Sequence, residues 1–383
     1  MVLGIDFHKR YSRLVLFDER SAENEDDIVT LDALFYRDEI DKSTYLEASK
    51  EDDYHLINNI YDSREDLLDY LKLITGKVCG AKKPDKIALC VYDFTLATLD
   101  MIRDCLDEMG YDDRDIIMIN REEALASYIF HQSIDIRNRS CFVFDYSKEG
   151  LMVYDIEQSG ESGKELFRIE EHDCTKDIPY LGDTSEATLK KLDVLLYDVA
   201  LKSFDKHNVA CVFLFGEGFG SDRRYDEFMS FICKKRRVFA GENLYCMGAV
   251  YFACDEKNGI SQKTVSCKDK IEYDLDLDIV EWGQSSLLRV VKRGTNWYRA
   301  RKKLTFFISP DTKALTLHRV KEYEKGIENI EIPVNELPII DNMLRRINIG
   351  FDFSPSGACN VYIQDKGFGE FDRAGSMFVK VEI

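Results

Sequence analysis

Apolar residues in the first two thirds of the chain alternate between short strand-like runs and longer stretches with helical spacing. Helices are predicted over residues 95–110, 186–204, 222–235 and 242–255. Strands are predicted over residues 2–6, 13–18, 87–92, 115–120, 140–146, 151–156 and 210–215. Alternating strands and helices favour a mixed or parallel sheet with helices on its faces. Residues 21–60 are rich in Asp and Glu, and we interpret them as a reduced, largely solvated insertion.

The pattern changes near residue 256. Residues 256–270 are polar with little periodicity, which is typical of a linker. Beyond them, four apolar residues alternate with three aspartates: Tyr273, Leu275, Leu277 and Ile279. Further strands are predicted over residues 287–291, 304–308, 314–320, 329–333, 346–353, 359–364 and 376–383. The sequence therefore predicts an α/β domain over 1–255, a linker over 256–270 and an all-β sandwich over 271–383.

Composition and charge argue against two classes of binding partner, nucleic acids and membranes. The chain has 383 residues and a formal net charge of -19, and such an acidic surface repels nucleic acid phosphates and anionic lipids. We therefore expect neither nucleic acid nor membrane as a partner. The sequence shows no run long enough to span a bilayer and no basic export signal, so a cytoplasmic location is expected. The 11 cysteines include no Cys-x-x-Cys pair, which favours buried, reduced thiols.

Two strand–turn–strand units, residues 4–12 and 144–150, carry the candidate chemistry. Each places one aspartate, Asp6 or Asp145, at the end of an apolar strand that turns at once into another. A turn that grips phosphate needs backbone N–H groups at close range, and glycine permits that approach. Here bulky and charged side chains stand in both turns, so we interpret them as phosphate loops whose glycines have been replaced.

These units and several later motifs resemble the DnaK-type heat-shock chaperones, whose ATPase domain is actin-like. Residues 4–12 and 144–150 resemble the two phosphate motifs of that family, and residues 212–218 resemble its adenosine motif. Residues 119–128 and the pair Gly248-Ala249 resemble its two connecting helices. The best match is residues 332–367, which resemble the last strands of the family's peptide-binding sandwich. The resemblance implies an actin-like two-lobed ATPase fold followed by a β-sandwich.

The sequence departs from the family at the positions that carry its chemistry. His8, Lys9 and Arg10 stand where the family has Gly and two Thr. Ser147, Lys148 and Glu149 replace three glycines, and Arg121 falls where the family carries a catalytically important Glu. The chain ends after the last sandwich strand, so the family's helical lid is expected to be absent. These departures predict a degenerate ATPase domain.

The resemblance also implies a set of nucleotide-site residues. Asp6 and Asp145 would hold Mg²⁺, only together with ATP or ADP. Lys9, Arg10 and Lys148 would grip phosphates as point charges, and Gly216 and Gly218 would lie beside the adenosine. Each residue has a plainer interpretation: the aspartates as strand-end turn residues, the glycines as a turn before a helix, and the basic residues as filling the cleft or pointing to solvent.

A second candidate site lies in the β domain. By resemblance, Ile279 and Trp282 fall on the first substrate loop, and Phe306, Leu315 and Leu317 line an apolar peptide cleft. The alternative is that Leu315 and Leu317 face the sandwich core, as alternating strand residues usually do.

Two functions follow from these predictions. The first is a chaperone-like or adaptor protein that binds a polypeptide, with a degenerate, non-hydrolysing ATPase domain. The alternative is a nucleotide-gated, DnaK-like ATPase chaperone with an atypical Lys/Arg phosphate grip.

Overall fold

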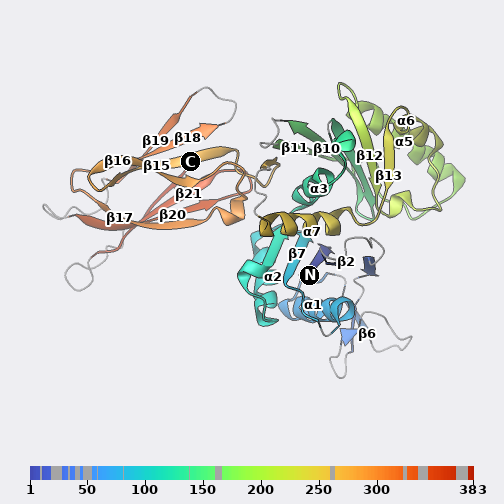
Figure 1. Ribbon diagram of the computed structural model, residues 1–383, viewed down its shortest axis with the longest axis horizontal. Helices are drawn as coiled ribbons and strands as arrows, with labels where there is room; N and C mark the ends of the chain where they lie inside the picture. The colour runs from blue at the N-terminus through green and yellow to red at the C-terminus, as the bar shows by residue number, and fades with distance from the viewer. Residues whose placement is uncertain are drawn as a thin grey trace. The chain divides into compact units, whose positions relative to one another are not determined.

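The computed structural model divides the chain into two compact units, Met1–Val265 and Ser266–Ile383 (Figure 1). It describes residues 1–8, 11–18, 28–32, 35–38, 44–45, 54–57, 59–80, 82–137, 139–159, 166–258, 264–321, 326–334, 344–367 and 378–383.

The first unit begins with a five-stranded sheet of order β3-β2-β1-β7-β8. Its centre is the antiparallel hairpin of β1 (Val2–Phe7) and β2 (Tyr11–Phe17). Parallel strands β7 (Lys86–Val91) and β8 (Ile116–Ile119) extend the sheet on one side, and β3 (Ile28–Asp32) extends it on the other. Helices α1 (Arg64–Cys79) and α2 (Leu96–Glu108) pack against each other beside this sheet.

A six-stranded sheet of order β13-β12-β9-β10-β11-β14 repeats this plan. It also starts from an antiparallel hairpin, β9 (Ser140–Ser147) with β10 (Gly150–Ser159), and adds two parallel strands, β12 (Val209–Phe215) and β13 (Arg237–Ala240). Strands β11 (Leu166–Asp173) and β14 (Thr264–Ser266) extend the other edge. Helices α5 (Glu186–Ser203) and α6 (Asp226–Ile232) bury their apolar faces against this sheet. The duplicated plan confirms the predicted actin-like ATPase fold.

Two helices cross where the halves of this unit meet: α3 (Arg121–Phe130) and α7 (Leu244–Lys257). In Figure 1, α7 lies between the two sheets. A Cβ atom added to Gly248 would come within 2.1 Å of the carbonyl oxygen of Ala124. Only glycine therefore allows the two helices to approach this closely.

The acidic segment 21–60 is more structured than the sequence predicts. Its described residues form β3 in the first sheet and a separate three-stranded sheet of order β5-β4-β6, with β4 (Phe35–Asp38), β5 (Thr44–Tyr45) and β6 (Tyr54–Ile57). The sequence predicts no regular element in this segment, whereas short runs rich in β-branched and aromatic residues form these strands. Part of the predicted linker also belongs to regular elements, since α7 continues to Lys257 and β14 occupies 264–266.

The second unit consists of two four-stranded antiparallel sheets, which confirms the predicted all-β sandwich. One sheet contains β15 (Tyr273–Glu281), β16 (Gln284–Val291), β18 (Ala314–Lys321) and β19 (Glu328–Pro333). The other contains β17 (Lys302–Ile308), β20 (Arg345–Phe353), β21 (Cys359–Asp365) and β22 (Phe378–Glu382). The alternation in β15 buries Tyr273, Leu275 and Leu277, and the Tyr273 ring contacts the Phe353 ring of the other sheet.

Short helical segments complete the described structure: η1 (Asp113–Asp115), α4 (Ile134–Arg137), η2 (Glu217–Phe219) and η3 (Trp297–Arg299). Within the described residues, none of the helices combines the length and apolar character needed to cross a bilayer.

Candidate functional site

Asp6, at the end of β1, lies beside an arginine of the neighbouring strand. Arg13 is its cross-strand partner in the β1–β2 hairpin, and the Arg13 Nη1 to Asp6 Oδ2 distance is 3.6 Å. The other terminal nitrogen of Arg13, Nη2, lies 3.6 Å from Oε1 of Glu217, which belongs to the second half of the unit. The Arg13 guanidinium also lies over the rings of Tyr11 and Phe215, 4.8 Å from each centroid. Arg13 is thus held between two aromatic rings and two carboxylates.

Asp145 of β9 has an equivalent environment. Arg121 Nη1 donates a hydrogen bond to Asp145 Oδ2 at 2.8 Å, and the Tyr245 hydroxyl donates to the same oxygen at 2.7 Å. The Arg121 guanidinium lies 4.5 Å from the Tyr92 ring centroid and 4.6 Å from that of Tyr245. Both aspartates therefore face a buried arginine that is placed between two rings. We call Asp6, Arg13, Arg121 and Asp145 the Arg–Asp cluster.

All four members of the Arg–Asp cluster are buried. Burial raises the pKa of Asp6 to about 6, although Arg121 and Arg13 act to lower it. Burial also raises the pKa of Asp145, against the lowering effects of Arg121 and of the Tyr245 hydrogen bond. Removing charges from water is costly unless opposite charges lie close by. The two arginines supply those charges, whereas Asp6 Oδ1 and Oδ2 and Asp145 Oδ1 have no hydrogen-bond partner among the described residues.

Side chains also connect the two turns that the sequence predicts to be phosphate loops. His8 Nε2 of the first turn lies 3.4 Å from Glu149 Oε1 of the second. The His8 ring is fully buried and lies 4.4 Å from the Tyr11 ring and 4.2 Å from the Tyr92 ring, centroid to centroid. A bulky ring therefore occupies a position where a phosphate loop needs glycine. Lys148 is exposed, and the predicted phosphate contacts Lys9 and Arg10 lie outside the described residues.

The two glycines of the predicted adenosine motif pack against Tyr146. Gly216 has a φ of +96°, and a Cβ there would come within 2.6 Å of the Tyr146 carbonyl oxygen. A Cβ on Gly218 would come within 2.2 Å of the Tyr146 ring. This close approach accounts for both glycines as parts of a turn, which was the plainer interpretation of them.

The predicted peptide-site residues lie in different environments of the second unit. Trp282 is 97% exposed at the β15–β16 turn, with a φ of +52°. Ile279 and Leu315 are partly buried, whereas Leu317 is fully buried opposite Leu277 of β15. Leu317 is thus a core residue and not a cleft lining. Phe306 is partly buried and belongs to β17 of the other sheet.

Most of the first unit matches a known protein family. A family described as "Family of unknown function (DUF5716) C-terminal" matches residues 31–269, more than half of the chain. The chain belongs to this DUF5716 family. Residues 270–383 match a second description, "Domain of unknown function (DUF8552)". A comparison with curated protein sequences finds no match.

Solved structures with similar folds are very distant from this DUF5716 member in sequence. MreB 5 of Spiroplasma citri bound to AMPPNP is 12% identical, with a TM-score of 0.44 over 68% of this chain and 97% of the other. An archaeal actin homolog is 11% identical, with a TM-score of 0.42 over 67% of this chain and 99% of the other. A polyphosphate/ATP-glucomannokinase from an Arthrobacter strain is 12% identical, with a TM-score of 0.40 over 67% and 98%. These likenesses concern the fold alone.

The Mg²⁺ site that the DnaK-type resemblance implies would lie beside two buried arginines in this DUF5716 member. Mg²⁺ is a hard cation that is bound through one or two carboxylates together with phosphate and water. Here Asp145 is already hydrogen-bonded to Arg121, and Asp6 faces Arg13. The positive charge of a guanidinium beside each carboxylate would oppose a second cation there.

Sequence reasoning singled out both aspartates but missed their partners. Arg13 could have been found, because a hairpin joining β1 and β2 directly places it opposite Asp6. Arg121 was noticed only as a replaced glutamate, and Tyr245 carried no sequence signal. Tyr245 is 100 residues from Asp145 along the chain, so only the packing of α7 brings the two together.

Proposed function

We propose that this chain is a non-hydrolysing, actin-like protein that acts by binding a polypeptide, as a chaperone-like or adaptor protein. The observation that carries this proposal is the self-neutralised Arg–Asp cluster at the ends of β1 and β9. Phosphoryl transfer depends on positioning and on charge stabilisation around Mg²⁺. Both aspartates that would hold the metal are instead paired with buried arginines, so the actin-like unit acts as a scaffold.

The first test measures nucleotide binding and turnover. We expect no change in melting temperature with millimolar ATP, with or without Mg²⁺, and no phosphate release above the buffer background. A ligand present at 100 times its Kd would stabilise the chain by about 2.7 kcal/mol, which such a measurement detects readily. Clear Mg²⁺-dependent stabilisation together with turnover would refute the non-hydrolysing assignment.

One observation favours the alternative, a nucleotide-gated protein with an atypical phosphate grip. Among the described residues, Arg13 Nε and Nη1 and Arg121 Nε and Nη2 are buried without a hydrogen-bond partner. Guanidinium groups with unused donors bind phosphate oxygens well. Stabilisation by ATP that disappears in an Arg121→Gln variant would support this alternative.

The support for polypeptide binding comes from one hairpin of the second unit. Trp282 is 97% exposed in its turn, and Val280 and Leu287 on the adjoining strands are 73% and 57% exposed. Grouped, exposed apolar side chains typically mark interaction surfaces, and tryptophan often contributes much of the binding energy at such surfaces. The DnaK-type relationship, which predicted Trp282 as a substrate-loop residue, remains part of this proposal.

Intrinsic fluorescence tests polypeptide binding directly, because the chain has only two tryptophans. Trp297 is buried and donates a hydrogen bond to Asp269, whereas Trp282 is exposed. Adding a permanently unfolded model polypeptide is expected to shift the emission of wild-type protein to the blue, as Trp282 leaves water. A Trp282→Phe variant should show no shift, and Trp282→Ala should also lose affinity in a pull-down. Wild-type emission that does not respond, with no retention of the polypeptide, would contradict the proposal.

A further inference from the structure

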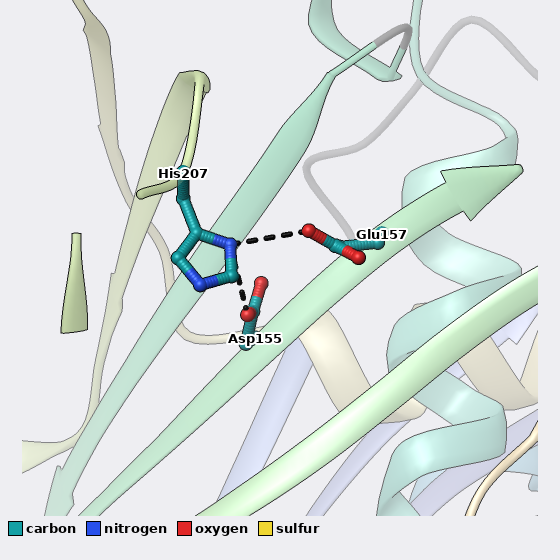
Figure 2. A group of neighbouring side chains, drawn as sticks. All are labelled: Asp155, Glu157 and His207. Carbon is teal, nitrogen blue, oxygen red and sulfur yellow. Dashed lines mark hydrogen bonds and ion pairs between the residues drawn. The ribbon is translucent and has the colours of Figure 1, made fainter. Parts of the chain in front are cut away.

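Three potential metal ligands converge beside strand β10 of the second sheet. Asp155 and Glu157 are alternate residues of β10, so their side chains project from one face of the strand. His207 lies in the turn between α5 and β12. Figure 2 shows the imidazole and both carboxylates directed toward one another. His207 Nδ1 lies 3.3 Å from Asp155 Oδ2 and 3.1 Å from Glu157 Oε1.

These separations match the edges of a metal coordination sphere. Zn²⁺ binds nitrogen and oxygen ligands at about 2.0–2.2 Å in tetrahedral geometry, which places neighbouring ligand atoms about 3.3 Å apart. One ligand atom from each of the three residues lies within 4.8 Å of the other two. Small side-chain rotations would therefore be enough to place all three around one ion.

The environment of Asp155 supports a cation site independently of these distances. Its residue exposure is only 6%, and its Oδ1 atom has no hydrogen-bond partner among the described residues. A buried carboxylate oxygen without a partner is costly, and a bound cation is one way to satisfy it. The side chains of Glu157 and His207 are 45% and 28% exposed, which leaves one side open for ion entry and for water ligands.

An aromatic ring packs against the imidazole, and an ion pair on the next strand lies beside Asp155. The buried Phe142 ring meets the His207 ring edge to face, with centroids 5.5 Å apart. Glu170 of β11 is the cross-strand partner of Asp155 and pairs with Arg168 at 2.7 Å. The ligand set thus contains one imidazole and two carboxylates.

We propose that Asp155, Glu157 and His207 bind a divalent transition-metal ion, for which Zn²⁺ is the representative probe, with water completing the coordination. Imidazole combined with carboxylate suits Zn²⁺ better than the hard cations Mg²⁺ and Ca²⁺. The site shares no residue with the Arg–Asp cluster or the Trp282 hairpin, so it goes beyond the proposed function. A bound ion would tie β10 to the turn that leads into β12.

Zn²⁺ titration of the chelator-treated full chain against a chromophoric competitor tests the proposal. We expect one high-affinity ion per chain and a higher melting temperature on binding. His207→Gln and Glu157→Gln should each weaken binding by at least about tenfold, and so should Asp155→Asn if that variant folds. His318→Gln is the matched control, because His318 also contacts an aspartate, Asp278 at 2.9 Å, but in the second unit. Its affinity should equal that of the wild type.

Co²⁺ substitution separates this site from adventitious binding by the 11 cysteines. Ligation by nitrogen and oxygen gives no thiolate charge-transfer bands, so their absence from the one-ion complex is expected. Thiolate bands, unchanged affinity in His207→Gln, or no saturable Zn²⁺ binding would each overturn the proposal. If the three residues form only an ion pair, His207→Gln will lower the melting temperature equally with and without Zn²⁺, and that result also overturns it.

Discussion

Replacing Arg121 with Met is expected to destabilise the first unit by about 3–5 kcal/mol, because it leaves the Asp145 carboxylate buried without its charged partner. Arg121 is 7% exposed and Asp145 is fully buried. Met keeps a flexible apolar side chain between the Tyr92 and Tyr245 rings. The loss of stability would therefore come mainly from removing the guanidinium charge. The measurement is urea unfolding followed by far-UV circular dichroism, since every α-helix among the described residues lies in the first unit.

Two further variants separate the buried charge from a general effect of removing arginine. Arg121→Met combined with Asp145→Asn removes both charges and is expected to recover much of the lost stability. Arg114→Met removes an exposed arginine whose partner Asp112 lies 3.2 Å away, with side chains 82% and 70% exposed. It should change stability by less than about 1 kcal/mol. Equal unfolding midpoints for Arg121→Met and Arg114→Met would show that the buried pair contributes nothing to stability.

Gly248→Ala is expected to destabilise the same unit by about 1–3 kcal/mol, although alanine is the better helix former. The new Cβ would meet the carbonyl oxygen and carbon of Ala124 at 2.1 and 2.6 Å. These are backbone atoms of α3 and cannot rotate away, so α3 and α7 would have to separate. The same unfolding measurement detects the effect.

The matched control is Gly76→Ala in α1. Gly76 is an exposed helical residue, and nothing lies within 4 Å of its added Cβ. The same substitution is therefore expected to stabilise the protein by up to about 1 kcal/mol through helix propensity alone. Destabilisation by Gly248→Ala together with stabilisation by Gly76→Ala would establish the close crossing of α3 and α7. A stabilising Gly248→Ala would contradict it.

The sequence by itself determined the class of the fold and several of its elements, although it did not predict α1 or β11. Period-two alternation located β15, where Tyr273, Leu275 and Leu277 are buried as predicted, and helical spacing located α2 and α5. The two aspartate-ended hairpins and the missing glycines were also visible in the sequence. These features are local, because side-chain periodicity along a strand or helix depends only on neighbouring residues.

Only the tertiary structure decided which distant residues contact the side chains of those hairpins. Arg121 reaches Asp145 across 24 residues of chain, and His207 reaches Glu157 across 50. Neither separation follows a helical or strand period, so no pattern in the sequence could reveal the contact. Buried charges are tolerated only where folding brings a partner from elsewhere, and that partner is set by how sheets and helices pack, not by the residues beside it.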